Sequence, residues 1–349
     1  MLVCPGRVAA RRARAEASLK YLLFGALASG IMLFGFSLIF GLTGTLDFPL
    51  LLKHSHLLLA REGSGLLFPG FGTAFLLSLV LVLTGLAFKI SMAPFHFWTP
   101  DAYEGAPVPV AALLSVGPKA AGLALWLRLM AALAPAWPLL QTVVLILTVC
   151  TMTLGNLVAL AQSNVKRLLA YSTIAQVGYL LIGFVVNTPG GVSALLVYLV
   201  AYLFMNLGAF ACVVAVVNAT GSESVEAFKG LSARAPALAF WCAIFLLSLA
   251  GIPPLAGFLG KFLVFGSAVS SGWWWLALAG LANSAIALYY YVNIIRLMYL
   301  AAPQTASPVR APLSLRLALG VCAVGTLLLG LFPGGLLRWA QSASVVSLL

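Results

Sequence analysis

The sequence predicts an all-α protein that crosses a membrane many times. Of its 349 residues, 63% are hydrophobic and only 7% are charged, whereas a soluble domain carries roughly 25% charged residues. A water-soluble fold of this length could not hide so much apolar surface, so soluble enzymes, secreted scaffolds and disordered chains are excluded. The apolar runs are continuous over about 20 residues, the length that a helix needs to span the hydrocarbon core. A β-barrel would show short alternating segments instead, so it is excluded too.

Turn residues and charges divide the chain into about nine segments that we expect to cross the membrane. The basic stretch that ends at Lys20 could start a signal peptide, but the apolar run after it is too long for one, so we expect that run to be retained. The expected crossings are residues 20–45, 70–93, 107–133, 138–161, 168–187, 191–218, 237–270, 274–299 and 314–336. Together they form one transmembrane domain over residues 1–349.

The stretch between the first two crossings, residues 46–69, is polar enough to be a solvated loop on the membrane surface. It contains His54 and His56, but two histidines without further ligands indicate a metal site only weakly. The five cysteines show no ligand spacing, which predicts no disulfide, iron–sulfur cluster or zinc site. These cysteines are Cys4, Cys150, Cys212, Cys242 and Cys322.

Two of the apolar segments are expected to contain a broken helix. Pro253 and Pro254 lie in the middle of residues 237–270, and Pro94 interrupts residues 82–100. A proline removes one backbone donor and clashes with the preceding turn, so it ends or kinks a helix. Broken helices at membrane depth survive only against protein or water, and they mark ion pathways in transporters.

Basic residues predict the orientation of the chain, because cytoplasmic loops of membrane proteins are enriched in lysine and arginine. With the N-terminus in the cytoplasm, the cytoplasmic side holds Arg7, Arg11, Arg12, Arg14, Lys166, Arg167, Lys229, Arg234 and Arg310. The opposite side then holds only Lys53, Arg61 and Arg338. Nine crossings place the C-terminus on that opposite side. The same bias accounts for the net charge of +12, so the expected partner is the lipid bilayer and not a nucleic acid.

Three lysines inside apolar runs are the strongest candidates for chemistry: Lys89, Lys119 and Lys261. A lysine at the bilayer centre costs about 2.5–3.5 kcal/mol, which indicates a function. Burial disfavours the charged form of an amine, so such a group can gain and lose a proton. The bases close to segment ends are better interpreted as anchors that reach the interface. They are Lys20, Arg128, Arg296 and Arg316.

The acidic residues all fall in loops or at segment edges, so the buried lysines have no obvious counter-ion within a span. Asp101 and Glu104 are the nearest candidates, and His96 in the same loop could either titrate or be held by hydrogen bonds. Neutral polar side chains at membrane depth either bridge helices or hold water in a proton path. These side chains belong to Asn156, Gln176, Asn206, Ser248, Asn283, Ser284 and Asn293.

Four stretches of sequence carry a family resemblance. They are residues 89–110, with the run from Tyr103 to Pro107, and then residues 117–122, 163–179 and 249–262. The chain resembles the antiporter-like membrane subunits of respiratory complex I, and within them the subunit N type of NADH-quinone oxidoreductase.

The resemblance implies a fourteen-helix subunit with two inverted five-helix repeats, each with one broken helix. Lys89 matches the lysine at the first break, Lys119 the central lysine and Lys261 the lysine at the second break. The first repeat is expected to be incomplete, over residues 1–136, followed by the second repeat at 137–299 and a C-terminal helix at 300–349. Members of the family pair the first lysine with a glutamate on an earlier helix. That helix has no counterpart here, so the chain is expected to begin just after it.

The function implied is that of a proton-translocating subunit of NADH-quinone oxidoreductase in the cell inner or plasma membrane. Lys89, Lys119 and Lys261 would form the relay, and redox energy from other complex I subunits would drive it. No cofactor-binding residue, nucleotide motif or haem ligand pattern is found, so NADH, FMN, iron–sulfur clusters and quinone are expected on those partners. Two alternatives stay open: a subunit of a multi-subunit Na⁺/H⁺ antiporter, which should add acidic or hydroxyl ligands at depth, and a truncated scaffold without catalytic function.

Overall fold

The computed structural model describes residues 5–61, 71–303 and 308–348, and its regular structure within these ranges is helical. The helices are α1 (Pro5–Thr43), α2 (Phe48–Arg61), α3 (Phe71–Ile90), α4 (Trp98–Gly105), α5 (Val108–Ala132), η1 (Ala134–Ala136), α6 (Trp137–Ala159), α7 (Val165–Val186), α8 (Pro189–Thr220), η2 (Val225–Phe228), α9 (Leu231–Arg234), α10 (Pro236–Ala250), α11 (Ala256–Ser270), α12 (Trp274–Leu300), α13 (Leu313–Leu331) and α14 (Gly334–Leu348).

Eight helical stretches among the described residues are long and apolar enough to cross a membrane. They are Arg14–Thr43, Thr73–Ile90, Val108–Ala132, Ala134–Ala159, Val165–Val186, Pro189–Thr220, Trp274–Leu300 and Leu313–Leu331. The shorter apolar helices α10 and α11 follow one another and together supply one more crossing. The predicted all-α membrane fold with about nine crossings is therefore confirmed.

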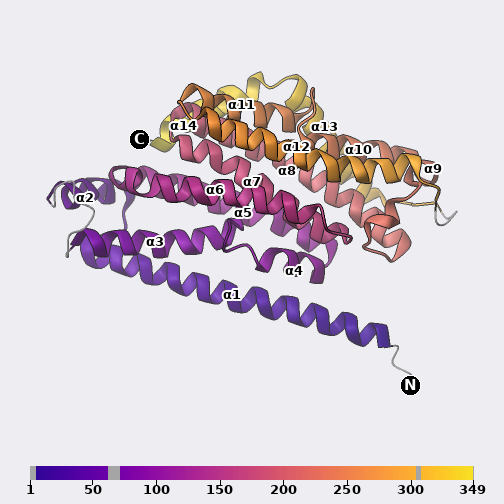
Figure 1. Ribbon diagram of the computed structural model, residues 1–349, viewed down its shortest axis with the longest axis horizontal. Coiled ribbons are helices and arrows are strands. Elements are labelled where there is room, and N and C mark those ends of the chain that lie inside the picture. The colour runs from indigo at the N-terminus through magenta and orange to yellow at the C-terminus, as the bar shows by residue number, and fades with distance from the viewer. Residues whose placement is uncertain (1–4, 62–70, 304–307, 349) are drawn as a thin grey trace.

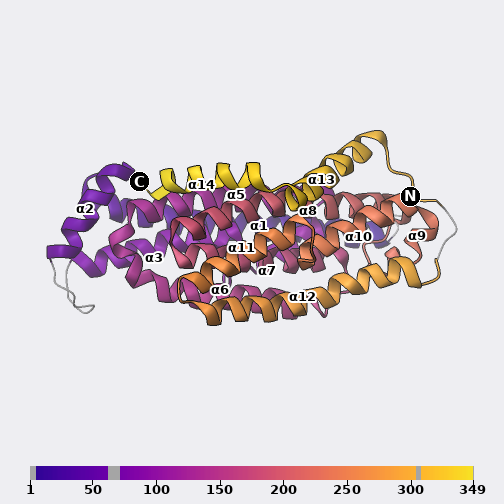
Figure 2. The same ribbon diagram turned by 90° about the horizontal axis from the view of Figure 1, so that it is seen from above.

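The long helices lie side by side along the long axis of the molecule (Figure 1). α1 lies at one side of the bundle and α12 near the other, while α7 and α8 run between them. α1 begins at the end of the bundle where α9 lies, and α14 ends near the opposite end, towards α2 (Figure 2).

The core is centred on α7, whose residues from Ser172 to Val186 are all buried. Asn164 caps the start of α7 by accepting hydrogen bonds from the amides of Lys166 and Arg167, and Asn187 ends the helix in the left-handed conformation. Because other helices surround α7, its polar side chains, including Thr173 and Gln176, face protein and not lipid. α7 therefore lies at the centre of the bundle, and the polar side chains described below lie around it.

Both predicted helix breaks are present. α3 ends at Ile90, Ser91 follows with a φ of 65°, and α4 begins seven residues later at Trp98. α10 ends at Ala250, Gly251 follows with a φ of 93°, and α11 begins at Ala256. The positive φ at Gly251 favours glycine because it has no Cβ. Pro94 lies in the first break, and Pro253 and Pro254 lie in the second.

Two parts of the sequence prediction need correction. Within residues 46–69, the structure forms helix α2 instead of a loop, with residues 62–69 outside the described ranges. Leu51 and Ser55 are buried while Lys53 is exposed, so the segment is an amphipathic helix that packs on α5 and η1. The predicted C-terminal helix is in fact two helices, α13 and α14, because Pro333 lies between them.

Candidate functional site

Lys119 is completely buried in the middle of α5. Its ammonium donates hydrogen bonds to the hydroxyl of Tyr103, at 3.0 Å, and to the carbonyl of Leu114, at 3.1 Å. That carbonyl lacks its usual helical donor because the residue four positions later, Pro118, has no N–H. The ammonium also lies 4.8 Å from the centre of the Trp98 ring, within the range of a cation–π interaction. The proline thus creates the polar site that the neighbouring lysine fills.

At the second break, Lys261 likewise binds carbonyls that prolines leave without a helical donor. Its ammonium donates to the carbonyls of Leu249, at 3.1 Å, and Ala250, at 2.9 Å. These are the two carbonyls whose helical donors would be the N–H groups of residues 253 and 254, and both of those residues are prolines. A third bond goes to the Ser284 hydroxyl at 2.8 Å, and the Tyr179 ring centre lies 4.6 Å away. The break therefore forms a carbonyl-lined site for one ammonium group.

Tyr202 links the surroundings of Lys119 to α7. Its hydroxyl lies 3.1 Å from the Ser115 carbonyl, which is next in the chain to the Leu114 carbonyl that Lys119 uses, and 3.1 Å from the Thr173 hydroxyl. Asn206 donates to the Ser115 hydroxyl at 2.6 Å. Tyr202, Thr173, Ser115 and Asn206 are all fully buried. Polar groups from α5, α7 and α8 therefore meet beside Lys119.

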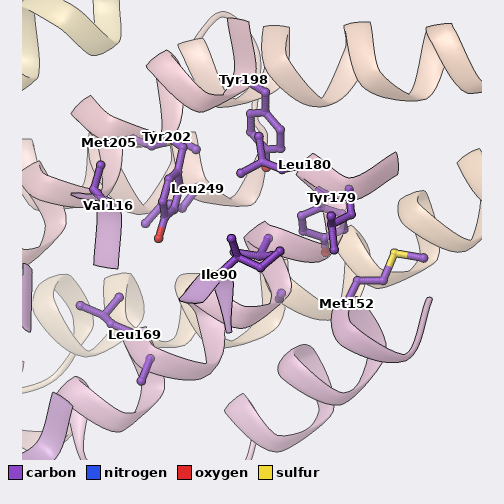
Figure 3. Packing of buried hydrophobic residues seen from close by; sticks show 14 of the residues in the cluster. Ile90, Val116, Met152, Leu169, Tyr179, Leu180, Tyr198, Tyr202, Met205 and Leu249 are labelled. Atoms are coloured by element: carbon purple, nitrogen blue, oxygen red, sulfur yellow. The ribbon is translucent and has the colours of Figure 1, made fainter. Parts of the chain in front are cut away.

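Gln176 links α7 to Lys261. Its amide nitrogen donates to the Leu249 carbonyl at 3.0 Å, the same carbonyl that accepts from Lys261. Its amide oxygen accepts a hydrogen bond from the Tyr198 hydroxyl. Figure 3 shows Tyr198, Tyr202 and Leu249 within the packing between these helices.

The polar groups beside Lys119 and those beside Lys261 are separated by one turn of α7. Thr173 and Gln176 are three residues apart on α7, and Tyr198 and Tyr202 are four residues apart on α8, so each pair shares one helix face. We name the set of Ser115, Thr173, Gln176, Tyr198 and Tyr202 the buried polar row. It connects the surroundings of both buried lysines, and no direct hydrogen bond joins its two halves within this set of residues.

Lys89 differs from the other two lysines. Its side chain is exposed at the end of α3, and its ammonium makes no hydrogen bond to the described residues. The expectation of three buried lysines is therefore wrong for Lys89. The neighbouring residue Ile90 takes the buried position against Gly122 of α5 instead. The first carbons of the Lys89 side chain also lie near Gly122, although the residue as a whole is exposed.

Asp101 and Glu104 pair with bases at the end of the bundle and not with the buried lysines, which corrects the expected counter-ion role. Asp101 lies 2.9 Å from the ammonium of Lys20 and 3.0 Å from the guanidinium of Arg167, and Glu104 lies 2.8 Å from the same guanidinium. Partial burial acts to raise the pKa of Asp101, but the hydrogen bonds and charges of Lys20 and Arg167 outweigh it and hold this pKa below its ordinary value. A cavity of about 460 Å³ opens beside these residues.

Lys166 is a buried base that the sequence analysis placed in a loop. Its ammonium pairs with Glu223 at 2.7 Å and donates to the carbonyls of Glu104 and Ala106, at the end of α4. These contacts hold α4, which carries Tyr103, against the start of α7. The charge alone could not have shown this, because an interfacial base and a buried one have the same local sequence.

The remaining predicted residues have mixed surroundings. His96 is buried in the first break beside Phe97, and its titration stays a prediction. Asn156 and Asn283 form a second buried network with Tyr179 and Tyr290. The other predicted positions have simpler surroundings: the Ser248 hydroxyl accepts from the Gly257 amide, Asn293 accepts from Arg296, and Arg128, Arg296 and Arg316 are exposed.

The sequence analysis missed the tyrosines of the site, Tyr103, Tyr179, Tyr198 and Tyr202. Aromatic residues are common in apolar helices, so nothing distinguishes a hydroxyl that faces a lysine from one that faces a core. Pro118 did carry a usable signal, because a proline directly before a lysine in an apolar run frees a carbonyl one turn earlier. Within the described ranges, no group of three histidine, cysteine or acidic side chains could hold a metal ion.

Comparison with known proteins identifies the family. The model of the family "NADH:quinone oxidoreductase/Mrp antiporter, TM" matches residues 2–287. NADH-quinone oxidoreductase subunit N of Anaeromyxobacter sp. (strain Fw109-5) is 43% identical over 95% of this chain and 68% of its own length. Across the curated relatives that it matches, the chain spans about two thirds of their length or less.

Comparison with solved structures supports the same family. A chain of respiratory complex I from Thermus thermophilus is 37% identical, with a TM-score of 0.75, over 93% of this chain and 68% of that one. A chain of the Mrp complex from Dietzia sp. DQ12-45-1b has a TM-score of 0.85 at 24% identity, over 96% of this chain and 68% of that one, which shows a shared fold. The fold, the matched residues and the identities to relatives agree, and the chain therefore belongs to the NADH:quinone oxidoreductase/Mrp antiporter family of membrane subunits.

Proposed function

We propose that the chain is a proton-translocating membrane subunit of an NADH-quinone oxidoreductase. The observation that carries this proposal is the pair of buried ammonium groups, Lys119 and Lys261, with the buried polar row between their surroundings. A buried charge without function is a cost that a membrane protein avoids. The identities to subunits named N support the same assignment.

In this proposal Lys119 and Lys261 each hold and release one proton. We call each lysine, together with its hydrogen-bond partners, a station. Burial disfavours the ammonium form, while the carbonyls freed by Pro118, Pro253 and Pro254 favour it. These opposing effects suit a group that alternately holds and releases a proton. A proton on one lysine disfavours a proton on the other through like-charge repulsion, which is weakly screened at low dielectric.

The buried polar row supplies the groups between the stations. The hydroxyls of Tyr202, Thr173 and Tyr198 can both donate and accept a proton in a hydrogen bond, as a relay requires. In this proposal a water molecule bridges the turn of α7 between the Thr173 hydroxyl and the Gln176 amide, which lie on the same face.

Lys89 is the predicted third station. Its ammonium lies on an exposed face, so a carboxylate from outside the described residues would complete the station. The order of lysine and break is opposite at the two sites, because Lys89 precedes its break and Lys261 follows its own. The division into two inverted repeats, over residues 1–136 and 137–299, is part of this proposal and is supported by the family relationship alone.

Redox partners supply the energy in this proposal, and NADH, FMN, iron–sulfur clusters and quinone belong to those partner subunits. The chain would lie in the cell inner or plasma membrane. The end that carries Arg167, Lys166 and Arg234 would face the cytoplasm, since basic residues are retained on that side.

Substitution of the two buried lysines tests the proposal. In vesicles that contain the assembled complex, Lys119→Met and Lys261→Met should each lower proton pumping at least tenfold per electron transferred, with the complex still assembled. Lys53→Met is the matched control, because Lys53 is an exposed lysine on α2. Pumping at the normal ratio in both variants would overturn the relay.

The same vesicles separate the alternatives. Proton movement that requires sodium would favour a Na⁺/H⁺ antiporter subunit. Loss of assembly, with normal pumping by each complex that remains, would favour a scaffold.

A further inference from the structure

An apolar groove runs between α10 and α13, away from both buried lysines. Its volume is about 530 Å³, and its walls include Leu238 and Trp241 of α10 and Leu319, Ala323 and Leu327 of α13. None of the residues that line it is acidic. The groove starts at the first turns of both helices, at the end of the bundle where α9 lies (Figure 2).

The groove is open at the outer surface of the described helices. Beside it, α13 presents an exposed apolar stripe that includes Leu317, Val321 and Val324. From Arg316 at its mouth to Leu327, the α13 wall extends over about 16 Å at 1.5 Å per residue. That length matches a large part of an extended acyl chain within one leaflet, since the hydrocarbon core is about 30 Å thick.

The mouth of the groove is positively charged. Arg316 lines it, and its guanidinium donates a hydrogen bond from Nε to the Ala311 carbonyl at 2.8 Å, while its terminal nitrogens make no hydrogen bond to the described residues. Arg310 directly precedes the lining residue Ala311. α10 and α13 both begin here without a side-chain cap, and the positive ends of their helix dipoles add to the charge.

We propose that this groove binds one anionic phospholipid, with an acyl chain along α13 and the headgroup phosphate at Arg316. Zwitterionic lipids would fit the apolar part equally well, but they would gain less from the arginine. The proposal concerns lipid binding alone, so it is independent of the proton relay.

Native mass spectrometry of the full chain tests this proposal after equilibration in vesicles of equal phosphatidylglycerol and phosphatidylcholine. The unsubstituted chain should retain phosphatidylglycerol in preference. Arg316→Gln should reduce that preference about fivefold, the effect of one basic side chain on an anionic lipid. Gly320→Phe should remove the retained lipid altogether. Gly320 lines the groove, and an added Cβ there meets no atom within 4 Å, so the ring fills the groove without disturbing the fold.

Two matched variants control for general effects. Gly30→Phe adds the same ring at a glycine of α1 that also has open space around it, and Arg296→Gln removes an exposed arginine from α12. Neither should change the retained lipid. Equal retention of lipid by the unsubstituted chain and Gly320→Phe would overturn the proposal, and it would leave a protein segment as the occupant of the groove. Equal loss of preference in Arg296→Gln and Arg316→Gln would overturn the headgroup position.

Discussion

The two helix breaks can be compared directly, because each combines a proline, a lysine and a helix that restarts within a few residues. At the second break, Lys261 donates to the freed carbonyls of Leu249 and Ala250, so its ammonium group replaces the helical donors that the prolines lack. At the first break, neutral groups form the hydrogen bonds that hold the broken backbone. The Trp98 indole donates to the Phe88 carbonyl at 3.1 Å, and the Ala93 amide donates to the Thr151 hydroxyl at 3.0 Å.

The position of the lysine relative to the break explains the difference. Lys261 lies in the second turn of α11, and helical side chains point towards the N-terminus of their helix, so its ammonium reaches back to the end of α10. Lys89 precedes its break, and although its first carbons lie near Gly122 of α5, the residue stays exposed. A lysine next to a proline is therefore buried only when the fold brings its side chain to the carbonyls that the proline frees. Lys119 meets this condition within a single helix, through Pro118.

The largest effect is expected from Gly257→Ala. A Cβ at Gly257 would lie 1.8 Å from the Ser248 carbonyl oxygen, so α11 could not pack against the end of α10. We expect a loss of at least about 3 kcal/mol in stability, at the upper end of overpacking effects, measured by thermal unfolding in detergent. Gly266→Ala on the same helix is the control, because no atom lies within 4 Å of its added Cβ. Equal melting temperatures for both variants would show that the second break is loosely packed.

A smaller effect is expected from Ser284→Ala, which removes one of the three oxygen atoms around the Lys261 ammonium. The loss should be about 1–2 kcal/mol, the range for hydrogen bonds to charged groups and the upper range within membranes. Ser284→Thr keeps the hydroxyl and should restore the melting temperature. If Ser284→Ala melts like the unsubstituted chain, the two carbonyls alone hold Lys261.

The ion pairs of α4 should give a pH-dependent effect. The pKa of Asp101 is lowered in the folded chain by Lys20 and Arg167, so its stabilisation is present above the ordinary pKa of aspartate and is lost as the pH falls through the lowered value. Asp101→Asn should cost less than about 1 kcal/mol at neutral pH, because exposed ion pairs contribute little. The difference in melting temperature from the unsubstituted chain should shrink as the pH falls below about 4, the ordinary pKa of aspartate, and through the lowered value. A difference that stays constant over this range would assign the effect to packing.

The smallest effect is expected from Lys89→Met. The side chain is exposed and makes no hydrogen bond to the described residues, so the stability of the isolated chain should change by no more than about 0.5 kcal/mol. Comparing the thermal unfolding of Lys89→Met with that of Lys261→Met would sharpen the comparison, since Lys261→Met removes three hydrogen bonds at the second break. A destabilisation of Lys89→Met as large as that of Lys261→Met would show that Lys89 is held as firmly as Lys261.

The residues that sequence reasoning placed correctly are those whose role depends on neighbours along the chain. The breaks at Pro94 and at Pro253 and Pro254 follow from the missing N–H of proline, which needs no knowledge of the fold. Lys119 and Lys261 stand out because a charge within an apolar run is costly wherever the helix lies. Helix α2 was missed because its apolar side is short and interrupted by Lys53, His54 and His56.

The residues that were placed wrongly depend on which helices come together. Asp101 and Glu104 lie next to the first break in the sequence, yet they bind Lys20 and Arg167, which come from α1 and α7. Lys166 has the same local setting as an interfacial base, but Glu223 and the end of α4 enclose it. The hydroxyls of Tyr198 and Tyr202 became parts of the buried polar row only because α7 and α8 face each other.

The sequence by itself determined that this chain lies in a membrane, about how many times it crosses and where two of its helices break. These properties follow from hydropathy and backbone chemistry, which act over one or two helical turns. Only the tertiary structure decided that Lys89 lies on the surface, that Asp101 and Glu104 pair at the end of the bundle and that a row of hydroxyl and amide groups joins the surroundings of Lys119 and Lys261. Those outcomes depend on the rotation of each helix about its axis, which the packing of several distant segments sets together.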